Sequence, residues 1–108
     1  MLPAGGHKII DSAFNGQEAV EKYRVLSPRP DLIIMDHRMP IKNGLDATKE
    51  ILAADPKARV LVISADATVE PKYQSTGVAG FLEKPFTMDV LFSKITLSID
   101  ASRVRVNP

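Results

Sequence analysis

Short apolar segments alternate along the chain with segments in which apolar residues recur at every third or fourth position. The central apolar segments are continuous, as in 32–35, and this pattern is typical of strands buried on both faces of a parallel sheet. The wider spacing predicts amphipathic helices between the strands. The predicted strands are residues 8–13, 32–35, 60–63 and 80–83, and the predicted helices are residues 16–26, 44–54, 69–76 and 87–99.

Polar and conformationally special residues mark the ends of these helices. Asn15 offers a side-chain cap ahead of the first helix, with Glu18 three positions later, and Thr87 can cap the last helix. Gly77 is placed to end the third helix. Strands and helices therefore alternate in four β-α units, which predicts an α/β fold built on one open parallel sheet.

Composition and charge fit a single domain over residues 1–108, with 100–108 as a C-terminal tail. The chain has no cysteine, which excludes disulfides and thiolate metal sites and favours a cytoplasmic location. No apolar run is long enough to span a bilayer, and the start of the chain lacks the layout of a secretion signal. With a net charge of +1 and no basic cluster beyond Arg103 and Arg105, we expect no nucleic-acid partner.

Three polar residues directly follow apolar strands, namely Asp36, Ser64 and Lys84. The carboxyl ends of parallel strands meet at one edge of an open sheet, so we expect these side chains in one site. A carboxylate can attack a phosphoryl group, an ammonium can pair with its oxygens and a hydroxyl can donate a hydrogen bond to one of them. Strand ends are often polar simply because the chain leaves the core, so the three residues carry weight only together.

Longer motifs surround these positions. They are the segment 30–40 (PDLIIMDHRMP) followed by Asn43-Gly44, the strand 60–65 (VLVISA), and the segment 80–86 (GFLEKPF). In order and spacing they resemble the phosphoacceptor strand and loop, the hydroxyl-bearing strand and the lysine–proline segment of the receiver domain of two-component response regulators. The likeness runs from about residue 8 to residue 99 and implies a flavodoxin-like, CheY-like open parallel sheet.

The resemblance implies a role for each matching residue. Asp36 would accept a phosphoryl group from a histidine kinase or phosphotransfer protein, Ser64 would hydrogen-bond this group, and Lys84 would form an ion pair with it. Phe81 takes the place of the switch aromatic residue, although its pattern fits a plain core position equally well. The backbone carbonyl of Arg38 would join Asp36 as a Mg²⁺ ligand. The resemblance also implies a cis Lys84–Pro85 peptide, structural roles for Pro40, Gly44 and Pro85, and a partner-binding face formed by 69–76, 80–83 and 87–99.

The family pattern normally begins with a buried strand ending in two adjacent acids, and no adjacent acids occur in this sequence. Residues 1–7 resemble at most the end of a first helix or a linker, so the pattern is incomplete at the N-terminus, as in a truncated form. Since these acids supply much of the magnesium site, we expect weak Mg²⁺ binding and slow or absent phosphorylation. Strand 8–13 could slide beside 31–36, or another chain could fill the gap, and a bare sheet face predicts self-association.

Two functions stay open at this point. The chain can be a phospho-switch receiver that acts on a partner protein, or a degenerate receiver that works as an interaction or dimerisation module without phosphorylation. Neither is an enzyme beyond taking up and losing its own phosphoryl group. A phosphatase of the haloacid-dehalogenase type would need a second acid two residues after the nucleophile, where this chain has Arg38. His37 follows the nucleophile and is expected to be a solvated loop side chain.

Overall fold

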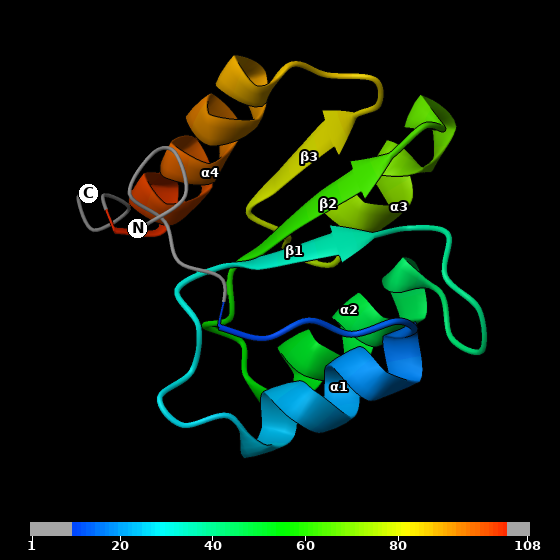
Figure 1. Ribbon diagram of the computed structural model, residues 1–108, viewed down its shortest axis with the longest axis vertical. Helices are drawn as coiled ribbons and strands as arrows, with labels where there is room; N and C mark the ends of the chain where they lie inside the picture. The colour runs from blue at the N-terminus through cyan, green and yellow to red at the C-terminus, as the bar shows by residue number, and fades with distance from the viewer. Residues whose placement is uncertain (1–9, 104–108) are drawn as a thin grey trace.

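The computed structural model describes residues 10–103 and folds them into a three-stranded parallel sheet with helices on both faces (Figure 1). The strand order is β1-β2-β3, so each strand lies beside the next one along the chain. The elements are α1 (Gly16–Val25), β1 (Ile33–Asp36), α2 (Gly44–Ala54), β2 (Val60–Ser64), the 3₁₀ turn η2 (Ala67–Val69), α3 (Glu70–Gln74), β3 (Gly80–Glu83) and α4 (Met88–Arg103).

Helix ends are set by the residues that the sequence marks for this purpose. The Asn15 side chain accepts a backbone N–H of the first turn of α1 at 2.8 Å, and Thr87 accepts one from α4 at 3.3 Å. Gly77 has a φ of 91°, a backbone conformation that favours glycine over other residues. Asn43, which lies directly ahead of α2, caps this helix in the same way by accepting an N–H at 2.9 Å.

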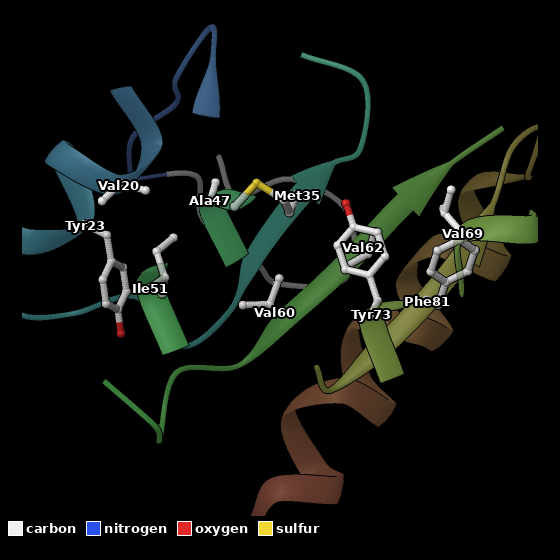
Figure 2. Close-up of a cluster of buried hydrophobic side chains, with 10 residues drawn as sticks. All are labelled: Val20, Tyr23, Met35, Ala47, Ile51, Val60, Val62, Val69, Tyr73 and Phe81. Atoms are coloured by element: carbon white, nitrogen blue, oxygen red, sulfur yellow. The ribbon is translucent and has the colours of Figure 1, made fainter. Parts of the chain in front are cut away.

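Two clusters of buried side chains hold the sheet between its helices. On one face, α1, α2 and α3 close over a core in which ten residues are buried (Figure 2). On the other face, α4 packs against β2 and β3 over a smaller core. The larger core contains Val20, Tyr23, Met35, Ala47, Ile51, Val60, Val62, Val69, Tyr73 and Phe81, and the smaller one contains Leu61, Ile63, Leu82 and Ile95.

Predicted and observed elements agree at most boundaries. Helix 44–54 and strand 80–83 are found as predicted, and α1 ends one residue before its predicted end. The predicted helix 69–76 is the 3₁₀ turn followed by a five-residue α3, whereas the last helix continues to Arg103. Neither α4 nor any other helix within residues 10–103 is long and apolar enough to cross a membrane.

The predicted strand at 8–13 is wrong for residues 10–13, which form no strand, while 8 and 9 lie outside the described residues. Local polar contacts hold this segment instead. The Asp11 carboxylate accepts the N–H of Ser12 at 2.8 Å, and the Lys22 ammonium binds both the Asp11 carboxylate and the Ser12 carbonyl. Because these bonds occupy polar groups that sheet pairing would need, residues 10–13 do not slide beside β1.

Candidate functional site

Asp36 ends β1 at the carboxyl edge of the sheet, with its side chain 46% exposed. One carboxylate oxygen, Oδ2, accepts from the Lys84 ammonium at 3.0 Å. The other, Oδ1, accepts the backbone N–H of Arg38 at 3.3 Å. The two residues predicted to carry opposite charges at this edge are therefore in direct contact, although 48 positions separate them in the sequence.

Lys84 reaches Asp36 because backbone contacts fix the position of the residue that follows β3. Its backbone N–H donates to the carbonyl of Ser64 at 2.9 Å, which continues the pairing of β2 and β3 by one residue. The following Lys84–Pro85 peptide is cis, as the resemblance implied. The Lys84 side chain is 41% exposed, so the ion pair lies where water and a small anion can reach it.

Ser64 lies at the end of β2, between the other two strand ends, and is almost fully buried at 2% exposed. Its hydroxyl accepts the backbone N–H of Asp66 at 3.0 Å and donates to the Asp66 carbonyl at 3.3 Å. Asp66 in turn caps η2 through Thr68, and these bonds from the Thr68 hydroxyl and N–H lower the pKa of the Asp66 carboxyl. The Ser64 hydroxyl is thus held by the turn that leads into α3.

Phe81 and His37 both face the larger core. Phe81 is 9% exposed and lies 6.1 Å from the Tyr73 ring, measured between ring centroids (Figure 2). His37 was expected to be a solvated loop side chain, but it is half-buried and its Nδ1 lies 2.6 Å from the Tyr73 hydroxyl. Sequence reasoning missed this pair because Tyr73 is 36 residues away and was grouped only with the third helix.

Loop 37–43 is fastened to the start of α2. Gly44 donates its N–H to the His37 carbonyl at 2.9 Å. A Cβ on Gly44 would lie 2.3 Å from the Asp36 carbonyl oxygen, so the backbone approach requires glycine, as the structural role predicted for Gly44 implies. Pro40 accepts the N–H of Lys42 at 2.7 Å through its carbonyl and thereby closes a tight turn in the same loop.

Comparison with known proteins shows which family the chain resembles. A model of the response regulator receiver domain matches residues 2–96. The chain belongs to this family. The chemotaxis protein CheY of Thermotoga maritima is 40% identical to this receiver over 88 residues, which cover 80% of the receiver and 72% of CheY. The transcriptional regulatory protein PdtaR of Mycobacterium tuberculosis is 35% identical over 105 residues, which cover 95% of the receiver but only 50% of PdtaR.

Solved structures agree with the family assignment. A chain of the CheX–CheY–BeF₃–Mg²⁺ complex from Borrelia burgdorferi superposes on the receiver with a TM-score of 0.79 at 31% identity, covering 84% of the receiver and 69% of that chain. The response regulator domain of Thermotoga maritima CheB gives a TM-score of 0.75 at 30% identity, covering 95% and 81%. The CheY-like α/β fold predicted from the sequence is confirmed.

The residues described in this receiver do not supply a magnesium site, although the Borrelia complex contains Mg²⁺. Among residues 10–103, no group of three or more carboxylate, histidine or cysteine side chains is placed to hold a metal ion. Both oxygens of Asp36 already accept hydrogen bonds, and Mg²⁺ favours several oxygen ligands in near-octahedral geometry. Asp36 and the Arg38 carbonyl are too few ligands for the ion, so the donor set does not fit it.

Proposed function

We propose that this receiver accepts a phosphoryl group on Asp36 and transmits its presence to a partner protein. The observation that carries the proposal is the Asp36–Lys84 pair, in which an accessible carboxylate lies 3.0 Å from an ammonium at the carboxyl edge of the sheet. The ammonium can attract an anionic donor and neutralise charge on the transferred group, while the carboxylate acts as the nucleophile. The pair supplies a nucleophile and one neutralising positive charge, two of the parts on which phosphoryl transfer depends.

The transfer forms one bond and breaks one. An Asp36 carboxylate oxygen forms a P–O bond, and the bond between phosphorus and the donor's leaving group breaks. With a phosphohistidine donor this is a P–N bond, and the departing imidazole nitrogen keeps the electron pair. The product is an acyl phosphate on Asp36. Lys84 then pairs with the phosphoryl oxygens, and the Arg38 N–H is near enough to donate to one of them.

The response of Ser64 follows from its present partners. To donate to the phosphoryl group, its hydroxyl must give up the bond that it donates to the Asp66 carbonyl, which weakens its hold on the turn into η2 and α3. Phe81, packed beside Tyr73 of α3, is the aromatic residue placed to follow that rearrangement. The surface of α3, β3 and α4 is therefore the face that a partner would read. A protein partner of this kind has a precedent in the family, since the Borrelia CheY was solved in complex with CheX.

A second function is favoured by a different observation, the poor magnesium ligand set. Without several oxygen ligands for the ion, charge on the transferred phosphoryl group is neutralised mainly by Lys84, and transfer slows. The chain would then act as a phosphorylation-independent interaction module. The half-exposed Ile34 on the α4 face favours self-association as one such interaction, because apolar surface left in water drives contact with a second copy.

Intact mass spectrometry separates the two functions. The protein is incubated with phosphoramidate or acetyl phosphate, with and without Mg²⁺, and weighed. The phospho-switch predicts a gain of one phosphate that is absent in Asp36→Asn and slower in Lys84→Ala. Asp46→Asn, which removes a nearby first-turn carboxylate of α2, is the matched control and should label like the parent protein. No gain under conditions that label a complete receiver would reject the switch in favour of the module.

A further inference from the structure

His37, the residue after Asp36, makes hydrogen bonds to three different elements. Its backbone N–H donates to the carbonyl of Ile63 in β2 at 3.0 Å, and its carbonyl accepts from Gly44 at the start of α2 at 2.9 Å. Its ring nitrogen Nδ1 lies 2.6 Å from the hydroxyl of Tyr73 in α3. Since His37 is covalently bonded to Asp36, any change that moves the Asp36 backbone acts on all three contacts at once.

Tyr73 is the only buried residue of the five-residue helix α3. It is 0% exposed, its ring meets the His37 ring edge-on with centroids 5.5 Å apart, and its hydroxyl lies 2.8 Å from the point where a Cβ on Gly44 would be. A helix this short has little stability of its own and depends on such packing. The position of α3 is therefore set largely by the contacts of one side chain.

The surroundings of the Tyr73 hydroxyl connect it to the charge on Asp36. Burial raises the pKa of its hydroxyl, and the nearby Asp36 and Asp46 carboxylates raise it further, so the hydroxyl keeps its proton. The Tyr73 hydroxyl and the His37 Nδ1 therefore share one hydrogen bond, whose direction is set by the tautomer of the His37 ring. The effect of Asp36 on this pKa also means that the carboxylate charge acts on the Tyr73 hydroxyl at a distance. A change in the charge on Asp36 therefore changes the electrostatic environment of the hydrogen bond between Tyr73 and His37.

We propose that Tyr73 is a positioning residue that couples α3 to the charge state of Asp36 through the His37 imidazole. This is a second route to the partner-reading face, separate from Ser64, and both routes meet at the Tyr73–Phe81 contact. The proposal rests on the proposed function in one respect: phosphorylation is taken to be the event that changes the charge at Asp36 in the cell. The coupling itself can be measured without any phosphoryl transfer.

The experiment uses amide chemical shifts of α3 in ¹⁵N-labelled protein. Asp36→Asn removes the carboxylate charge and is expected to shift the amide signals of residues 70 and 72–74. The same substitution made in a Tyr73→Phe background, which keeps the ring and removes the hydroxyl, is expected to lose that shift. Tyr23→Phe is the matched control, because Tyr23 is a buried tyrosine of the same core whose hydroxyl binds Asp55, away from the site. In that background the shift should persist.

Substitutions at His37 distinguish coupling from simple packing. His37→Asn can place an oxygen near the position of Nδ1 and accept the Tyr73 hydroxyl, so it should retain the α3 response, whereas His37→Leu should lose it. The proposal is overturned if Asp36→Asn leaves the α3 signals unmoved, or if they respond equally in the Tyr73→Phe background. The mass test of Asp36 phosphorylation is independent, so failure of the proposed function and failure of this coupling give different results.

Discussion

On one face of the sheet, three helices close over ten buried residues, whereas on the other, α4 packs on β2 and β3 and leaves Ile34 of β1 48% exposed. Because side chains alternate along a strand, Met35 faces the closed side and Ile34 faces the open one. Asp36 follows the same alternation as Ile34, and His37 contacts Tyr73 on the closed side. The Asp36 carboxylate thus lies on the more open face, where Lys84 binds it, while the neighbouring His37 packs on the closed one.

The largest expected effect on stability comes from truncating two neighbouring side chains of β1 that face opposite sides of the sheet. Met35→Ala should lower the free energy of unfolding by about 2–4 kcal/mol. The Met35 side chain is only 2% exposed, so truncating it leaves a cavity in the core. Ile34→Ala should lower it by only about 1 kcal/mol, since half of that side chain already meets water. Urea unfolding followed by circular dichroism measures both. Equal losses at the two positions would contradict the difference between the faces.

A smaller effect is expected where α1 and α2 are joined on the closed face. The Tyr23 hydroxyl donates to Asp55 at 2.6 Å, and Arg29 adds a bond to the same oxygen while stacking over the Tyr23 ring. The bond from Tyr23 holds the pKa of the Asp55 carboxyl below its usual range. A lowered pKa stabilises the fold above the unfolded-state value of about 4, and this contribution is lost as the pH falls through the lower folded-state value.

Asp55→Asn tests this contact. It should cost about 1 kcal/mol at pH 7, because a hydrogen bond to a charged group becomes one to a neutral amide. Below pH 4 the difference from the parent protein should shrink, since the parent carboxyl becomes protonated there. Thermal unfolding from pH 7 to pH 2 measures both. Asp31→Asn, at an exposed residue whose carboxylate forms no ion pair among residues 10–103, should change stability little at either pH. A constant loss at every pH would contradict the linkage.

Features that depend on nearby residues were the ones predictable from the sequence. The apolar run of β2 and the caps at Asn15 and Thr87 act within a few positions, and each was identified correctly. The Asp36–Lys84 contact spans a long separation, yet it was predictable because the carboxyl ends of parallel strands share an edge.

Features set by tertiary packing were not predictable in this way. Residues 10–13 have a strand-like pattern, but strand formation needs a pairing partner, and Lys22 holds this segment by side-chain contacts instead. The His37–Tyr73 bond depends on how deeply α3 packs against loop 37–43. Periodicity indicates which residues of a helix face the core but does not indicate which side chain each one meets.

The smallest effect on stability, and the most direct test of the open face, is expected from Ile34→Thr. This change keeps a β-branched side chain and should alter the free energy of unfolding by no more than about 1 kcal/mol. If the half-exposed Ile34 drives contact between copies, sedimentation velocity at tens of micromolar should show the parent protein associating and Ile34→Thr shifted toward monomer. Val25→Thr removes an apolar side chain that is 79% exposed at the end of α1, away from the open face, and should associate like the parent. A monomeric parent protein would show that the open face does not promote association, and an equal response to both substitutions would show that the effect belongs to apolar surface in general and not to β1.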